Sequence, residues 1–117
     1  MNKKIPIWIL QIGVAATFFG HGWLAFFFNP NWLPYLLSVG LSVESAEMVM
    51  PLIGAIDILL ALMILIRPYR YVLFYCIVWA FATALIRPLS GEPIWTFVEH
   101  GSDWAAPLAL YWLLYKK

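Results

Sequence analysis

Long apolar runs separated by short polar breaks are the main pattern along this chain. The first run covers residues 5–28 and ends at an Asn-Pro-Asn triplet, which favours a turn. Runs over 47–66 and 69–87 follow, and an Arg-Pro pair marks the end of each. A helix needs about 20 apolar residues to cross the ~30 Å hydrocarbon core of a bilayer. Each of the three runs is therefore predicted to be a transmembrane helix.

The last apolar run predicts a fourth transmembrane helix. Residues 104–115 are too few to cross a bilayer alone. A helix that begins near Pro93 would be long enough, and proline is favoured in a first turn. We therefore predict a span over 93–115. In the alternative, a new helix starts within residues 101–103, with Ser102 as its cap.

The segment between the first two runs, NWLPYLLSVGLSVES, is too long for a turn and too short to cross a membrane. Its tryptophan and leucines predict a short stretch lying at the membrane interface. The predicted fold is all-α. It is an integral membrane four-helix bundle, a single transmembrane domain over residues 1–117, with this interfacial segment between helices one and two.

Composition favours the same class. Of the 117 residues, 64% are hydrophobic and only 11% are charged, whereas an average soluble domain carries about 25% charged residues. A soluble protein of this composition could not cover its surface with polar side chains. The sequence contains no phosphate-binding loop and no basic patch of the nucleic-acid-binding kind, so nucleic acid is not an expected partner.

Charge placement predicts the orientation in the membrane. Six of the seven basic residues fall on one side of a four-span arrangement: Lys3, Lys4, Arg67, Arg70, Lys116 and Lys117. Five acidic residues fall on the other: Glu44, Glu47, Glu92, Glu99 and Asp103. Positively charged loops face the cytoplasm. We therefore expect both termini to be cytoplasmic, in a membrane of the bacterial inner-membrane type.

Ionisable residues inside the predicted spans are the candidates for function, because charge within a bilayer is costly. His21 lies between two glycines near the outer end of the first span, and Asp57 lies near the middle of the second. Arg87 ends the third. At 1.5 Å per residue, with side chains leaning toward their helix N-termini, the three converge in the outer half of the membrane. Three more ionisable residues follow just above: Glu99, His100 and Asp103. We predict a polar pocket that opens to the outer side, with these six residues as candidates for ligand binding or proton relay.

Structural roles are the alternative for each candidate. Asp57 could pair with Arg87 or His21 only to fix helix register. Arg87 could extend to lipid headgroups, and His21 could bond a backbone carbonyl. Glu99, His100 and Asp103 could be ordinary surface residues. If Asp57, His21 and Arg87 pair fully with one another and leave no cavity, these structural roles are favoured. A cavity of roughly a few hundred Å3 lined by these residues would favour ligand binding.

Other residue patterns bear on packing and on cofactors. A surface of small side chains near His21 predicts close helix approach; its members are Gly13, Ala16, Thr17 and Gly20. Cys76 is the only cysteine, which excludes two-cysteine redox chemistry. The histidines and acids lack the local spacing of a metal site, so no metal is expected.

Three stretches carry a resemblance to the DoxX-like family of small four-helix membrane proteins: FFGHGWLAFFF, GAIDILLALMILIRP and FATALIRPLSGEPIWTFVEHGSDWAAPLAL. The family's histidine-glycine pair is kept as His21-Gly22, but the basic residue that follows it is missing here. Asp57 stands where the family often has glutamate. The resemblance implies a four-helix bundle with both termini inside. Some relatives are subunits of thiosulfate:quinone oxidoreductases or of other membrane redox complexes.

The sequence thus leads to two functional hypotheses. In the first, the chain is a small subunit of a redox-linked membrane complex whose outer pocket binds a quinone or a similar lipid-soluble molecule. His21 would exchange a proton with a quinone oxygen, Asp57 would orient the imidazole, and Arg87 would stabilise an anionic ligand.

In the second hypothesis, the chain is a non-catalytic accessory or assembly subunit. The expected partners are the lipid bilayer and other membrane protein subunits or further copies of this chain. A channel formed by oligomers is a third possibility. No catalytic residue is assigned, and electrons would come from a partner.

Overall fold

The computed structural model describes residues 3–115, and all regular structure within that range is helical. The elements are α1 (Lys4–Phe26), the 3-10 turn η1 (Pro30–Trp32), α2 (Leu33–Ser38), α3 (Val43–Ile66), α4 (Arg70–Leu89), α5 (Trp95–Glu99) and α6 (Gly101–Tyr115). Three helices, α1, α3 and α4, are long and apolar enough to cross a membrane. The prediction of an all-α chain is confirmed for the described residues, and the three long helices have the length and apolarity of membrane spans.

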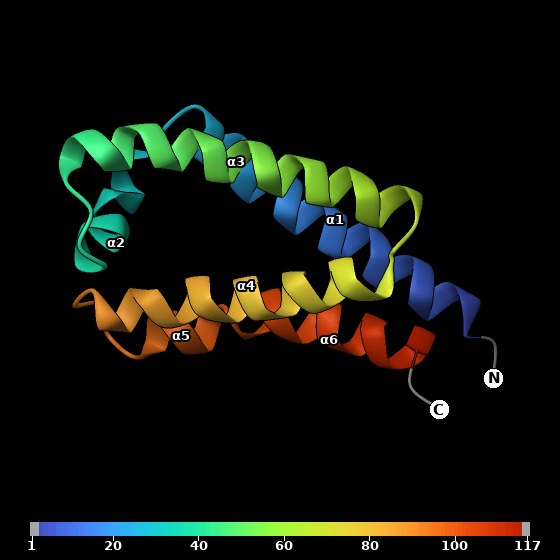
Figure 1. Ribbon diagram of the computed structural model, residues 1–117. Helices are drawn as coiled ribbons and strands as arrows, with labels where there is room; N and C mark the ends of the chain where they lie inside the picture. Colours follow the sequence, from blue (N-terminus) through green and yellow to red (C-terminus); the bar gives the residue numbers. More distant parts are fainter. Residues whose placement is uncertain (1–2, 116–117) are drawn as a thin grey trace.

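The helices form two packed pairs. α1 lies along α3 and α4 lies along α6, and α1 also contacts α6 (Figure 1). One end of the molecule contains the first turn of α1, the α3–α4 connection and the last turn of α6. We call it the basic end, after Lys4, Arg67 and Arg70. α2 and α5 lie at the opposite end, which we call the α2 end.

Local signals explain where the long helices start and stop. α1 ends at Phe26, two residues before the predicted boundary, and Phe28 then adopts a left-handed backbone (φ 61°) that a helix cannot continue. α3 starts earlier than predicted, because the Ser42 side chain accepts a hydrogen bond from the Ser45 amide and caps the helix. α4 runs through Pro88 and ends at Leu89 rather than at residue 87.

The prediction of one continuous fourth span over residues 93–115 is wrong. The chain breaks at His100 between α5 and α6. α6 has 15 residues, so its length is about 22 Å, which is short of the ~30 Å hydrocarbon core. The alternative, a new helix starting at residues 101–103, is what the structure has. Ser102, however, lies inside α6 rather than at its cap.

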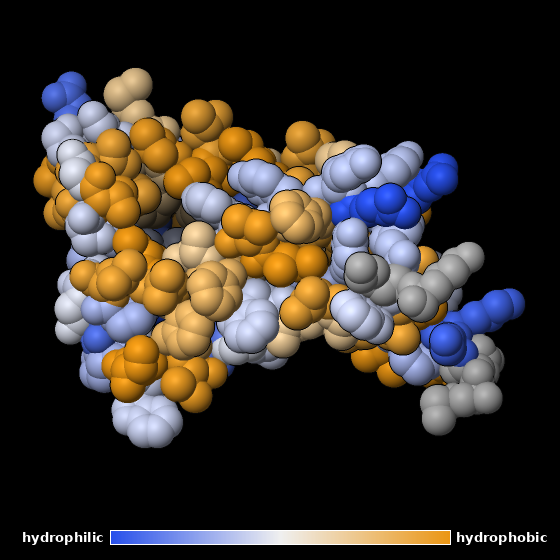
Figure 2. Space-filling model, turned by 60° about the horizontal axis from the view of Figure 1, so that its bottom comes forward, coloured by the Kyte–Doolittle hydropathy of each residue, from blue (hydrophilic) through white to orange (hydrophobic). Residues whose placement is uncertain are grey.

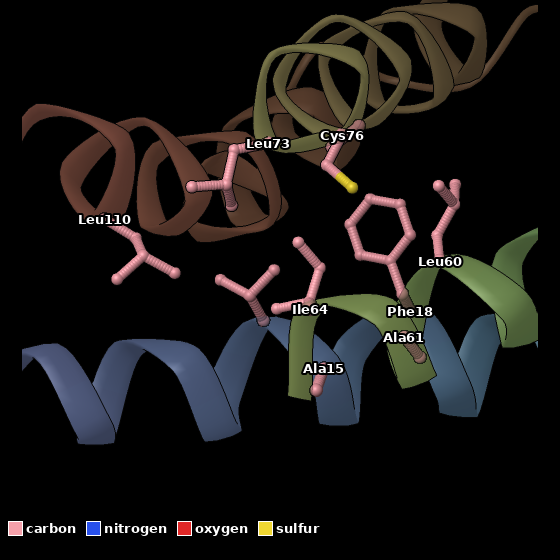
Figure 3. Packing of buried hydrophobic residues seen from close by; sticks show 10 residues of the cluster. Ala15, Phe18, Leu60, Ala61, Ile64, Leu73, Cys76 and Leu110 are labelled. Carbon is pink, nitrogen blue, oxygen red and sulfur yellow. The ribbon is translucent and has the colours of Figure 1, made fainter. Parts of the chain in front are cut away.

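The two pairs are held together toward the basic end by interlocking apolar side chains. Ile64, Leu73 and Leu110 are completely buried, and they point toward one another from α3, α4 and α6 (Figure 3). Phe18 of α1 faces the Cys76 thiol of α4 in the same cluster. In lipid, association rests on packing contacts rather than on exclusion of water. This cluster therefore fixes how the α1–α3 pair meets the α4–α6 pair.

The outer surfaces of the long helices are apolar. Large side chains of α1, α3 and α4 lie more than half exposed, for example Trp8, Leu52 and Phe74. Figure 2 shows apolar side chains over much of the face drawn, with hydrophilic ones at both ends of the molecule. A soluble monomer rarely exposes so large a contiguous apolar surface. The surface is typical of a protein that faces lipid.

Backbone contact between two glycines sets the crossing of α1 and α3. A Cβ atom added at Gly22 would lie 2.8 Å from the Gly54 carbonyl oxygen, and one added at Gly54 would lie 2.6 Å from the Gly22 carbonyl oxygen. Only glycine allows this approach. The predicted small-residue surface around Gly13 and Gly20 does not make the contact, because no atom beyond the local backbone of α1 lies within 4 Å of a Cβ built at either position. Close approach was predicted correctly, but on the wrong face of α1.

Gln11 is a buried polar residue that joins α1 to the end of α3. Its side-chain amide donates to the carbonyl oxygens of Ile64 (2.9 Å) and Leu65 (3.0 Å). Carbonyl groups in the last turn of a helix have no partner within the helix. Gln11 therefore donates hydrogen bonds to two carbonyl groups that lipid could not hydrogen-bond.

We expect Gln11→Leu to lower the free energy of unfolding by about 1 kcal/mol, since the substitution keeps the side-chain volume and removes both donors. Unfolding in mixed micelles, followed by circular dichroism, measures the change. Ile12→Leu, at an exposed position on the same helix, is the control and should leave stability unchanged. Equal stability of the Gln11 variant and the control would contradict this role.

Candidate functional site

A cavity of about 310 Å3 lies between the two helix pairs, in the half of the molecule nearer the α2 end. Its walls come from α1, α3, α4 and α6, and η1 and α2 close one side. Most of the lining is aliphatic or aromatic. Four of the six predicted site residues line it: His21, Asp57, Arg87 and Asp103. The volume falls at the lower end of the range for small-molecule sites.

Asp57 lies in the wall of the cavity, at the crossing of the first helix pair. It follows Gly54 by one turn of α3, and its Cβ is 2.9 Å from the position a Cβ of Gly22 would take. The residue is only 6% exposed. The Trp79 indole of α4, which also lines the cavity, is placed to donate a hydrogen bond to the carboxyl group. Within residues 3–115, no ion pair joins Asp57 to Arg87 or to His21.

His21 is half-buried and faces the cavity from α1. Its ring meets the Trp32 ring edge-on, with 5.7 Å between centroids. Among the described residues, no protein group hydrogen-bonds the imidazole nitrogens, so the alternative role for His21, a bond to a backbone carbonyl, is not found. The imidazole can therefore donate a hydrogen bond to a molecule in the cavity or accept one from it.

Arg87 belongs to a hydrogen-bonded chain that the sequence did not predict. Its Nη1 donates to the Tyr35 hydroxyl oxygen (2.9 Å), and that hydroxyl donates to Glu92 Oε2 (2.7 Å). The guanidinium also lies over the Tyr35 ring, 5.1 Å from the ring centroid. The chain connects the end of α4 to α2 and to the loop before α5. Tyr35 and Arg87 line the cavity, and Glu92 lies behind them.

The environment of Tyr35 affects its hydroxyl. Burial raises the pKa of Tyr35 above its usual value of 10.0, and the hydrogen bond to Glu92 raises it further. The charge of Arg87 acts in the opposite direction. The hydroxyl consequently stays protonated at neutral pH and remains a donor to Glu92.

The loop after α4 holds Glu92 in place. The Glu92 amide donates to the Arg87 carbonyl oxygen (3.1 Å), and the Ser90 hydroxyl donates to the same oxygen (2.8 Å). Gly91 has φ 111°, a backbone that favours glycine. This tight return of the chain places the Glu92 carboxylate next to α2, within reach of Tyr35.

The remaining predicted residues lie outside the cavity. Glu99 and His100 do not line it. His100 Nδ1 is 2.7 Å from the Thr96 carbonyl oxygen and 3.8 Å from Glu99 Oε1, and Glu99 is largely exposed. Within the described part of the chain, no three His, Cys, Asp or Glu side chains lie close enough together to hold a metal ion.

Several lining residues had no recognisable signal in the sequence. Tyr35 and Trp32 sit in the segment predicted to lie at the interface, where aromatic residues are ordinary anchors. Trp79 was likewise one aromatic among many. Thr17 and Thr83 carried a weak signal, because each lies one helical turn from an ionisable lining residue.

Comparison of the chain with protein-family models, with curated proteins and with solved structures found no match. The functional proposal therefore rests on the fold and the cavity.

Proposed function

We propose that this protein is a small membrane subunit that binds a lipid-soluble molecule, of the quinone class, in the cavity between its helix pairs, and that it works within a redox-linked complex. The observation that carries the proposal is the cavity of about 310 Å3, in which Asp57, His21 and Arg87 are not paired with one another. Residues retained only to fix helix register would be expected to pair and to fill the space between them.

The chemistry of the lining supports a ligand with a flat apolar body and polar oxygens. Aliphatic and aromatic side chains make most of the wall, and such walls bind apolar rings. Asp57 and Trp79 form one polar group in the cavity, and Arg87 and Tyr35 form a second nearer the α2 end. His21 offers its nitrogens to the cavity. A quinone carries two carbonyl oxygens on a flat ring, and each oxygen could accept a hydrogen bond from one of these two polar groups.

A partner subunit is part of the proposal, since a quinone site needs a source or acceptor of electrons. The chain resembles the DoxX-like family, some of whose members are subunits of such complexes. The α1 face around Gly13, Ala16 and Gly20 is exposed, and small residues allow close approach of another helix in a membrane. The same face would serve a purely accessory or assembly subunit, which is the alternative function.

The arrangement in the membrane is proposed on the same basis. α1, α3, α4 and the shorter α5–α6 unit would form a four-helix bundle in a bacterial inner membrane. The basic end would face the cytoplasm, so that both termini lie there. The cavity would then lie in the outer half of the bilayer, away from the basic end.

Purification in a mild detergent, followed by mass spectrometry and absorption spectroscopy of copurifying molecules, tests the proposal. We expect a bound quinone, and we expect added short-chain quinone to quench the fluorescence of Trp32 and Trp79, which line the cavity. His21→Ala and Asp57→Asn should each weaken binding about tenfold or more, since the first removes the imidazole and the second replaces an ionisable carboxyl by a neutral amide.

Glu99→Gln is the matched control, because Glu99 is acidic, exposed and outside the cavity. It should bind quinone like the wild type. Circular dichroism verifies that all variants are folded. If no small molecule binds, and the two cavity variants keep the same protein partners as the wild type, the accessory role is the better explanation.

A further inference from the structure

We infer that Glu92 makes the cavity selective for neutral ligands over anionic ones, by balancing the charge of Arg87 through Tyr35. The inference rests on the proposed function and specifies its ligand class. An arginine in the wall of an apolar cavity is commonly an anion site. The hydrogen-bonded chain around Arg87 leads to the opposite expectation.

The geometry ties the two charges together. Tyr35 accepts from Arg87 Nη1 and donates to Glu92 Oε2, at 2.9 Å and 2.7 Å. The backbone hydrogen bond from the Glu92 amide to the Arg87 carbonyl oxygen keeps the two residues near each other. Because these contacts span α2, α4 and the loop after α4, the carboxylate is not a freely moving surface group.

The charge balance at this part of the cavity follows from these contacts. Arg87 and Glu92 together carry no net charge, and two further acids, Asp57 and Asp103, line the cavity itself. Charges interact more strongly in an apolar environment than in water. An anion entering the cavity would therefore meet no uncompensated positive charge. A neutral carbonyl oxygen would still find donors, since the guanidinium group has five N–H bonds and Tyr35 takes one of them.

Two naphthoquinones of nearly equal size test the inference. 2-Methyl-1,4-naphthoquinone is neutral, whereas its 3-hydroxy derivative is an anion at neutral pH. Binding of each to the full-length protein in detergent is measured by quenching of tryptophan fluorescence. We expect the wild type to bind the neutral compound at least tenfold more tightly. We expect Glu92→Gln to shift the ratio of the two dissociation constants about tenfold toward the anion.

Glutamine keeps an oxygen that can accept the Tyr35 hydroxyl and removes only the charge, so the packing of the loop is preserved. Glu99→Gln removes an acid that does not line the cavity and should leave the ratio unchanged. A wild-type preference for the anion would overturn the inference, whether or not the variant folds. So would an identical ratio in the wild type and Glu92→Gln, although the quinone site itself would then stand. Failure of both compounds to bind the wild type would overturn the proposed function together with the inference.

Discussion

Replacing Gly54 by alanine is expected to reduce the stability of the protein by about 3 kcal/mol or more. The new methyl group would overlap the Phe26 amide nitrogen and lie 2.6 Å from the Gly22 carbonyl oxygen. Both atoms belong to the backbone of α1, so no side-chain rotation can relieve the contact. The two helices would have to separate, and overpacking in a tight interface typically costs 1–3 kcal/mol even where side chains can adjust. Unfolding in mixed micelles measures the loss.

The same change at two other glycines separates this steric effect from helix propensity. Gly13→Ala and Gly20→Ala lie on α1, where no atom beyond the local helix backbone is within 4 Å of the added carbon. Both variants should be as stable as the wild type, or slightly more stable, because alanine is the better helix former. A loss of stability in these variants equal to that of Gly54→Ala would mean that the crossing of α1 and α3 is not set by Gly22 and Gly54.

The loss of crossing geometry would also affect the site. Asp57 follows Gly54 by one turn of α3, and His21 precedes Gly22 by one residue on α1. Both candidate residues are therefore placed by the same contact. Separation of the helices would change the distance between them and open the wall of the cavity. We expect Gly54→Ala to bind quinone at least tenfold more weakly in conditions where it remains folded.

Thr83→Phe is expected to weaken ligand binding while leaving the fold intact. Thr83 is half-buried on α4 and lines the cavity, and its hydroxyl bonds only to the Ala80 carbonyl oxygen of its own helix. A phenyl ring at this position can occupy space that a ligand would need. We expect quinone affinity to fall at least tenfold, a cost of about 1.4 kcal/mol. The free energy of unfolding should stay the same or rise slightly, because the ring fills an open volume.

Thr96→Phe is the matched control for this substitution. The Thr96 hydroxyl makes the equivalent bond to the carbonyl oxygen three residues earlier, that of Pro93, and the residue does not line the cavity. It should keep full affinity for quinone. If Thr83→Phe bound quinone as tightly as Thr96→Phe does, the binding site would lie elsewhere on the protein.

The cavity also gives η1 and the short helix α2 a role that the sequence did not predict. The sequence predicted that this segment lies at the interface as an anchor. In the structure Trp32, Tyr35 and Leu36 turn toward the cavity and close one of its sides. The segment is held there by Tyr35, through its bonds to Arg87 and Glu92. Aromatic side chains that resemble interface anchors in the sequence are thus part of the site.

The sequence alone was sufficient for the helical class and for the three long helices. Length, apolarity and Arg-Pro breaks are local properties, and local properties decide where a long helix can form. Of the six candidate site residues, His21, Asp57, Arg87 and Asp103 line one cavity. Their depths could be estimated, because the rise per residue of a helix is constant. Glu99 and His100, which the sequence placed just above the other candidates, do not line the cavity.

Only the tertiary structure decided which faces meet and what lies between them. Close packing through Gly22 and Gly54, rather than Gly13 and Gly20, depends on the rotation of α1 about its axis. The few polar residues of α1 do not form a continuous polar face that could predict this rotation. The link from Arg87 through Tyr35 to Glu92 joins residues more than 50 positions apart. The cavity itself exists because the two helix pairs meet tightly near the basic end and leave space near the α2 end. That arrangement depends on how all the side chains pack together, which no local pattern in the sequence records.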